Sequence, residues 1–212
     1  MSTNTNALKI HSNDFDGCSN LKKLYFDYYN ATDNLRLVTP YGGIQIEEYA
    51  FKDKINLQGI YYKDKEGHNY LGIPRYVSSI GKEAFSGCTA LETLYIDETD
   101  IGERAFFGCS GLTWLKIVGN WSQSIESQAF AACTKLSTIY LSGRMSDLPD
   151  DIFQNDNKIK SIDIGSNVNI EWPKHAPLFE SPALLSITGD HSYSKMLCNS
   201  DKTTLWRCPR AL

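Results

Sequence analysis

Cysteine and histidine are the side chains of this chain best suited to metal binding, redox or nucleophilic chemistry. The 212 residues contain six cysteines and four histidines. Zinc sites use cysteines and histidines paired at short spacing, such as C-x-x-C, and the sequence has no such pair. Four cysteines instead follow a phenylalanine by three residues: Cys18, Cys88, Cys109 and Cys133. Because small thiols are often buried, this shared context predicts a column of buried thiols and no metal site.

The two remaining cysteines, Cys198 and Cys208, lie outside this context. They fall on the facing strands of a predicted hairpin, in which 195–198 and 204–208 flank a polar turn. A disulfide between them is one alternative, and it would indicate an oxidising compartment. Two free thiols are the other alternative.

The four histidines form no catalytic pattern. They fall in or near predicted loops and share no sequence context: His11, His68, His175 and His191. The chain has no P-loop, no G-x-G-x-x-G, no G-x-S-x-G and no H-E-x-x-H, which are motifs that position nucleophiles, phosphates or metals. We therefore expect a protein that is not an enzyme and that has no cofactor.

The cysteine context belongs to a longer unit that the chain repeats. The unit reads I-G-x-x-A-F-x-G-C-x-x-L-x-x-L-x-I, and it is clearest in residues 80–96, 101–117 and 125–141. Weaker copies on both sides bring the total to about seven. Their central phenylalanines are Phe15, Phe51, Phe85, Phe106, Phe130, Phe153 and Phe179. Self-similarity with a period of about 20–29 residues predicts a solenoid of the leucine-rich-repeat type.

The first two intervals between these phenylalanines are longer than the others, and we interpret the excess as hairpin insertions. The insertions fall near 30–46 and 60–72, where short strand-forming stretches flank turn residues. The predicted organisation is an N-terminal lead-in over 1–14, repeats over 15–190, and a C-terminal hairpin and tail over 191–212.

Each part of the repeat predicts its own local structure. The L-x-x-L-x-I part ends in an alternation of apolar and polar residues, which is typical of a short strand with one buried face. Stacked repeats would align these strands in one parallel sheet. The A-F-x-G-C part is too short for a lasting helix. We expect it to form one short helical turn on the other side, with the phenylalanine inward and the glycine ending the turn.

Composition narrows the range of partners. The formal net charge is −4 and the isoelectric point is about 5.6, which argues against general binding of nucleic acids or anionic membranes. No segment approaches 18 consecutive apolar residues, so no transmembrane helix is predicted. Residues 1–7 have no charged segment followed by an apolar one, so no signal peptide is predicted.

The A-F-x-G-C-x-x-L-x-x-L-x-I unit resembles the BspA-like leucine-rich repeats, a class found in surface proteins of gut and oral Bacteroidetes. Residues 72–81 resemble the family's I-P-x-x-V-x-x-I-G lead-in, and 199–209 resemble the hairpin that often separates its repeats. The resemblance implies a secreted or cell-surface binding protein, often an adhesin, whose partner is a host or cell-surface protein or glycoprotein. It implies no catalytic residues and leaves the oligomeric state open.

The strand pattern also predicts which side chains face outward. Each strand presents the residues on either side of its second leucine position, and aromatic residues are frequent there. The candidate ligand-binding residues are Tyr25, Tyr61, Tyr95, Trp114, Lys116 and Tyr140. Because neighbouring strands lie about 4.8 Å apart, the rings would form a ladder across the sheet. Tyr and Trp suit protein interfaces, while the alternative is that tyrosine pairs only stabilise the sheet.

Three functions are compatible with these features. The leading interpretation is a non-enzymatic protein that mediates adhesion or protein–protein interaction through the sheet face. A structural spacer within a longer surface protein would show no ligand-dependent change at the tyrosines. A glycan-binding module would show quenching of Trp114 fluorescence by soluble oligosaccharides.

Overall fold

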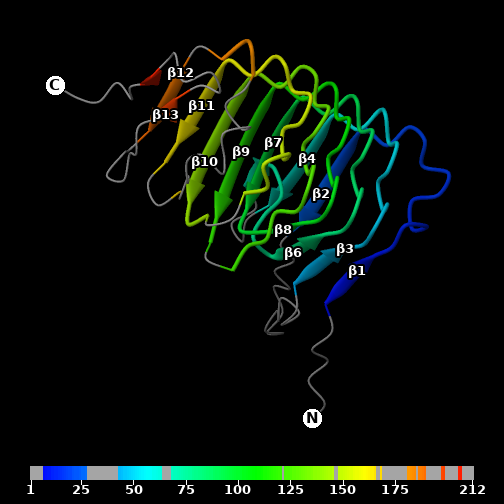
Figure 1. Ribbon diagram of the computed structural model, residues 1–212. Helices are drawn as coiled ribbons and strands as arrows, with labels where there is room; N and C mark the ends of the chain where they lie inside the picture. Colours follow the sequence, from blue (N-terminus) through cyan, green and yellow to red (C-terminus); the bar gives the residue numbers. More distant parts are fainter. Residues whose placement is uncertain are drawn as a thin grey trace.

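The chain forms a stack of turns and short strands (Figure 1). A computed structural model describes residues 7–27, 43–63, 68–120, 122–145, 148–165, 168, 181–184, 186–189, 197–198 and 205–206. No described segment forms a helix, and so none provides a helix able to cross a membrane. The strands are β1 (Leu8–Ile10), β2 (Lys23–Asp27), β3 (Ile44–Ile46), β4 (Gly59–Lys63), β5 (Asn69–Leu71), β6 (Val77–Ile80), β7 (Thr93–Asp97), β8 (Asp100–Ile101), β9 (Trp114–Gly119), β10 (Thr138–Gly143), β11 (Ser161–Ile164), β12 (Ser186–Gly189), β13 (Leu197–Cys198) and β14 (Leu205–Trp206).

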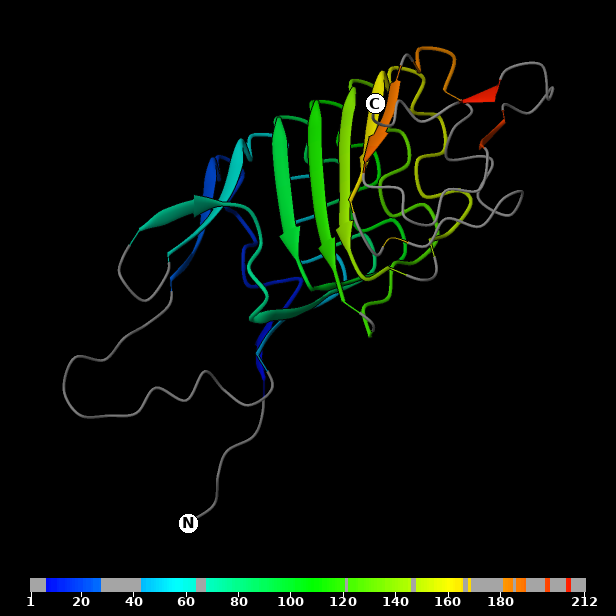
Figure 2. The ribbon, with the colours of Figure 1, turned by 90° about the vertical axis from the view of Figure 1, so that its left-hand side faces the viewer.

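Two rows of strands run along the stack (Figure 1). The longer strands come from the L-x-x-L-x-I part and form a parallel sheet in the order β12-β11-β10-β9-β7, with β2-β4-β5 as a separate sheet. Figure 2 shows the longer strands side by side, with the turn segments behind them. The second row has the order β1-β3-β6-β8. Its strands β3, β6 and β8 end at the isoleucine of the I-G part of the repeat. The parallel sheet is confirmed, whereas the second row was not predicted.

The insertion predicted near 60–72 is a hairpin that divides the row of longer strands. Strand β5 pairs antiparallel with β4, and the chain then passes between β4 and β7. There the backbone N–H of Gly72 donates to the carbonyl of Ile60 at 2.7 Å, and that of Ile73 donates to the carbonyl of Tyr95 at 2.7 Å. Strands β4 and β7 are therefore separated by this returning segment.

The other two predicted hairpins have different outcomes. Residues 44–46, expected in the insertion near 30–46, form β3, which pairs in parallel with β1 and β6. Residues 35–38, its expected partner strand, lie outside the described residues. The C-terminal hairpin is confirmed as the antiparallel pair β13–β14, in which Cys198 lies opposite Leu205. Cys208, its candidate disulfide partner, lies outside the described residues.

Glycine in the I-G part of the repeat permits close packing between repeats. A Cβ atom on Gly102 would lie 2.9 Å from the carbonyl oxygen of Ile80 and 2.9 Å from the backbone nitrogen of Lys82. A Cβ atom on Gly81 would lie 2.6 Å from the backbone nitrogen of Glu48. Real Cβ atoms do not approach backbone so closely, so a side chain here would force neighbouring repeats apart.

A continuous stack of phenylalanine rings fills the core. Successive ring centroids lie 4.7–6.0 Å apart, and the two central pairs are within 1° of parallel. The rings in the stack are Phe15, Phe51, Phe85, Phe106, Phe130 and Phe153. This order confirms the predicted register of six repeats, because only side chains at equivalent positions can stack in this way. The seventh anchor, Phe179, lies outside the described residues.

The helical turn predicted for the A-F-x-G-C part is not formed. Within this segment the backbone N–H groups alternate between two kinds of partner. Phe85 donates to the carbonyl of Ala105 in the next repeat at 2.8 Å, while Ser86 donates back to Glu83 at 3.1 Å. Glu83 has φ 51° and Gly87 has φ 74°, both outside the helical region. The segment is a series of tight turns because half of its donors bond to a neighbouring repeat, which is an arrangement that a helix does not allow.

The predicted column of buried thiols is confirmed for three of its four cysteines. Cys88, Cys109 and Cys133 are fully buried, and each thiol donates to the carbonyl of the preceding repeat's phenylalanine at 3.2–3.4 Å. Burial raises the pKa of Cys88 to about 12 and the pKa of the other two well above the ordinary value. These thiols are therefore protonated donors. Cys18, in the first repeat, is exposed.

The two exceptions in the cysteine column behave differently. Lys54 replaces cysteine in the second repeat, and its ammonium donates to the carbonyl of Phe15 at 2.9 Å, so it keeps the same hydrogen bond. Asp156 replaces cysteine in the sixth repeat and is 3% exposed, and neither carboxylate oxygen has a hydrogen-bond partner among the described residues. Burial raises the pKa of Asp156 to about 8, and the nearby Cys133 backbone amide opposes this rise less strongly.

Truncation of one ring tests the phenylalanine stack. Phe106→Ala should lower the free energy of unfolding by about 3–5 kcal/mol, because it leaves a cavity between two rings. Phe107→Ala, at the adjacent half-buried position, is the control and should cause a smaller loss. Urea unfolding of both variants measures the difference. Equal losses would contradict the proposed stack.

A glycine substitution tests the turn geometry by the sign of its effect. Ala132 has φ 59°, and a left-handed conformation costs a non-glycine residue about 1–2 kcal/mol. Glycine also gives the unfolded chain more conformational entropy, which offsets part of this gain. Ala132→Gly should therefore raise the free energy of unfolding by about 0.5–1 kcal/mol. In a helical turn the same change would lower it by about 1 kcal/mol. Ala131→Gly, a buried neighbour without a positive φ, should be destabilising.

The raised pKa of Asp156 predicts a pH dependence of stability. The folded state holds this proton up to about pH 8, whereas the ordinary pKa is 3.8, so the contribution of Asp156 to stability falls as pH rises between those values. The slope is at most about 1.4 kcal/mol per pH unit. Asp156→Asn should remove this slope, because asparagine does not titrate. The free energy of unfolding of the variant minus that of the parent should therefore increase with pH. Parallel stability curves for the two proteins between those values would refute the burial effect.

Candidate binding surface

The longer strands place alternate side chains in the core and in solvent. In β9, Leu115 and Ile117 are fully buried, while Trp114 and Lys116 are partly exposed. Strands β7, β10 and β11 repeat this alternation. We use the name long-strand face for the outward side of β2, β4, β7, β9, β10 and β11. It contains all six residues predicted to bind a ligand.

Strand pairing brings four of the predicted residues together. Trp114 lies opposite Thr93 and Thr138, and Lys116 lies opposite Tyr95 and Tyr140. The ring centroids of Trp114 and Tyr140 are 5.5 Å apart with an angle of 45° between the planes. The Lys116 ammonium lies 5.8 Å from the Tyr95 centroid. These contacts make one cluster of three rings and a cation, which we call the central cluster (Tyr95, Trp114, Lys116 and Tyr140).

Tyr25 and Tyr61 form a second group, which we call the N-terminal pair. Their rings are stacked at 5.2 Å with 21° between the planes, and Tyr25 is 50% exposed. A Cβ atom on Gly59 would lie 2.6 Å from the Tyr61 hydroxyl oxygen, so glycine provides the space that the ring occupies. The Lys23 ammonium lies 5.9 Å from the Tyr61 centroid. This pair therefore also combines stacked rings with a cation.

The expectation of one continuous ladder of rings is wrong. The hairpin that contains β5 lies between the N-terminal pair and the central cluster. Leu71 of β5 is directly opposite Tyr61, and Ile73 is hydrogen-bonded to Tyr95. Because the hairpin adds backbone between β4 and β7, Tyr61 and Tyr95 are not on paired strands. The long-strand face carries two aromatic groups in place of one stripe.

The surroundings of the Tyr95 phenol oppose its ionisation. Burial raises its pKa to about 12, and the neighbouring Asp97 carboxylate adds to the rise. Arg75 holds Asp97 through a hydrogen bond of 3.1 Å from Nε to Oδ2. Tyr95 therefore stays neutral under physiological conditions. It contributes a ring and a hydrogen-bonding hydroxyl to the surface, and no reactive phenolate.

The candidate binding residues left out some contributors to this surface. The strand alternation places Lys23 and Gly59 at the outward position before the second leucine, but they were not among the residues predicted to bind a ligand. The Arg75–Asp97 pair has no comparable signal. It depends on the path that the chain takes after the hairpin, which is not a local property of the sequence.

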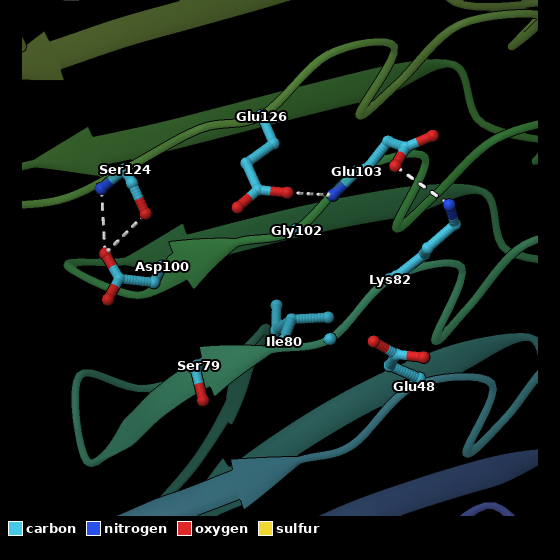
Figure 3. A pocket seen from close by; sticks show the side chains of 10 residues that line it. Glu48, Ser79, Ile80, Lys82, Asp100, Gly102, Glu103, Ser124 and Glu126 are labelled. Atoms are coloured by element: carbon cyan, nitrogen blue, oxygen red, sulfur yellow. Dashed lines mark hydrogen bonds and ion pairs between the residues drawn. The ribbon is translucent and has the colours of Figure 1, made fainter.

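A shallow groove of about 460 Å³ lies on the other row of strands, near β6 and β8 (Figure 3). Its polar side chains bond mainly to one another across repeats. The Lys82 ammonium donates to Glu103 Oε2 at 2.9 Å, and the Glu103 backbone N–H donates to Glu126 Oε2 at 2.9 Å. No three cysteine, histidine or acidic residues within the described ranges are placed to share a metal ion. The polar residues that line the groove therefore serve to connect successive repeats.

Comparison with known proteins bears on the repeat unit. A family model described as "BspA type Leucine rich repeat region" matches residues 45–171 in six copies. The structure of a leucine rich cell surface protein from Faecalibacterium prausnitzii A2-165 is similar with a TM-score of 0.46 and 18% sequence identity. The match covers 85% of this chain and 62% of that one, so the chain spans less than two thirds of its length. A search of curated proteins finds no match.

The matched region coincides with the most regular part of the stack. Residues 45–171 include the four repeats whose phenylalanines are fully buried: Phe51, Phe85, Phe106 and Phe130. The region covers more than half of the 212 residues. The chain therefore belongs to the family of BspA-type leucine-rich repeat proteins.

Proposed function

We propose that the protein is a non-enzymatic binding module that docks its partner on the long-strand face. The observation that carries this proposal is the central cluster, in which Trp114, Tyr140 and Tyr95 gather around Lys116 on a rigid parallel sheet. Trp and Tyr are the side chains most often found at the energetic centres of protein interfaces. A partner that covers these rings removes a large apolar area from water.

The rigidity of the surface supports binding. Each outward side chain is anchored by buried neighbours in the same strand, such as Leu115 and Ile117 on either side of Lys116. Paired strands and the phenylalanine stack hold the columns in register. A surface that is already ordered loses little conformational entropy when a partner binds, so more of the contact energy remains as affinity.

The family relationship supports a cell-surface location for this protein and a protein or glycoprotein as its partner. BspA-like repeats are typical of surface-displayed proteins, and we infer that this chain is secreted or displayed at a cell surface. Its partner would then be a host or cell-surface protein or glycoprotein, and its role adhesion. The repeat stack would act as the recognition element and would take no part in covalent chemistry.

Paired aromatic variants test the proposal. Trp114→Ala/Tyr140→Ala should weaken binding to a partner found in a panel of matrix proteins and mucins by roughly tenfold or more, because hot-spot truncations often cost 2 kcal/mol or more. Surface plasmon resonance measures affinity, and thermal unfolding checks that each variant folds. Tyr49→Ala is the matched control, because Tyr49 is 39% exposed but lies in a turn after β3.

Three outcomes separate the candidate functions. Loss of binding in the folded double variant, with the control unchanged, would support recognition by the long-strand face. Unchanged binding in the double variant would place recognition elsewhere. Absence of any binding by the parent protein would contradict the proposal and favour a structural spacer.

A further inference from the structure

The two aromatic groups of the long-strand face each combine a pair of rings with a lysine. Each joins two rings, stacked at 5.2 Å in the N-terminal pair and tilted at 5.5 Å in the central cluster. Each also has a lysine whose ammonium lies 5.8–5.9 Å from a tyrosine centroid. This shared combination indicates two similar subsites for a ligand that is itself repetitive.

Two lysines of this face, Lys23 and Lys116, differ from three lysines in other parts of the repeats. Lys9, Lys52 and Lys82 each form an ion pair with a glutamate at 2.7–3.1 Å. Lys23 and Lys116 contact rings and have no carboxylate partner among the residues that the structure describes. Their positive charge is therefore available to an anionic group on a ligand, although the protein as a whole carries a net charge of −4.

A row of hydroxyl groups continues from Trp114 across the sheet. Strand pairing aligns Trp114 with Thr93 on one side and with Thr138, Ser161 and Ser186 on the other. The hydroxyls of Thr138 and Ser161 are themselves 3.4 Å apart. Hydroxyl groups both donate and accept hydrogen bonds, which matches the requirement of sugar hydroxyls.

We propose that the long-strand face binds an anionic polysaccharide, with sugar rings packed on the two aromatic groups and carboxylate or sulfate groups at Lys23 and Lys116. The apolar faces of sugar rings suit the flat surfaces of Tyr and Trp. This inference rests on the proposed function, because it names the ligand of the same surface. It favours a glycan over an acidic protein because rings, cations and a hydroxyl row occur together.

The separation of the two subsites sets a minimum ligand length. Between Tyr61 on β4 and Trp114 on β9 lie the returning segment at Gly72 and Ile73, then β7. Three strand spacings of about 4.8 Å give a separation of about 14 Å. A single sugar is too short to reach both subsites, so oligosaccharides of several units should bind more tightly than monosaccharides through the effective concentration of the second contact.

The test compares octasaccharides that differ in charge. Heparosan carries carboxylates, carboxyl-reduced heparosan is its neutral counterpart, and heparin adds sulfates. Isothermal titration calorimetry should show binding of heparosan or heparin, and at least roughly tenfold weaker binding of the neutral form, because charge-assisted contacts are lost. Preference for heparin would identify sulfate as the group recognised, and preference for heparosan would identify carboxylate.

Charge-removing variants locate the effect. Lys23→Gln/Lys116→Gln should weaken anionic octasaccharide binding by roughly tenfold or more and should reduce its dependence on salt. Lys135→Gln/Lys158→Gln removes the same charge from two exposed lysines in turns and should leave affinity unchanged. A glutamate-rich peptide of equal charge should bind weakly.

Several results would overturn the inference. They are equal binding of the neutral octasaccharide, equal binding of the peptide, or equal losses in the two lysine variants. If no anionic octasaccharide binds while Trp114→Ala/Tyr140→Ala still abolishes binding to a deglycosylated protein, the glycan inference fails and the proposed function stands. If the aromatic variant affects no ligand, the proposed function itself fails.

Discussion

The carbonyl oxygen of the core phenylalanine is the group on which the rest of the structure depends. That of Phe85 accepts hydrogen bonds from the Cys88 backbone N–H within its own repeat and from the Cys109 thiol of the next repeat, both at 3.2 Å. A carbonyl has two lone pairs, so both are used. The bond fixes the distance between repeats at the point where the rings stack. Lysine can replace cysteine in this role because its ammonium reaches the same acceptor, as Lys54 does at Phe15.

This spacing at the core determines the arrangement of the outer surface. Once the rings are in register, the strands that follow them pair residue by residue, and equivalent outward side chains fall into columns. Trp114 and Lys116 therefore meet Tyr140 and Tyr95 without any direct interaction being needed to bring them together. The columns of the long-strand face are a consequence of repeat stacking, and outward residues can vary there without a change in the buried residues of the same strands.

The sequence predicts the features that depend on short-range pattern. The alternation around Leu115 predicts which side chains face outward, and the spacing of phenylalanines predicts the stack. Features that depend on distant partners were not predicted. The segment around Phe85 forms turns in place of a helical turn because its donors bond to Ala105 in the next repeat, and Tyr61 and Tyr95 are separated because the chain returns between their strands. Neither fact is a property of the local sequence.

The central claim is that a partner covers the long-strand face, and hydroxyl-radical footprinting of the complex tests it most directly. Oxidation rates of Trp114, Tyr25 and Tyr49 report on three parts of the surface in one experiment. The account predicts that the bound partner slows oxidation of Trp114 and Tyr25 and leaves Tyr49 unchanged. Protection of Tyr49 with no change at Trp114 would contradict it.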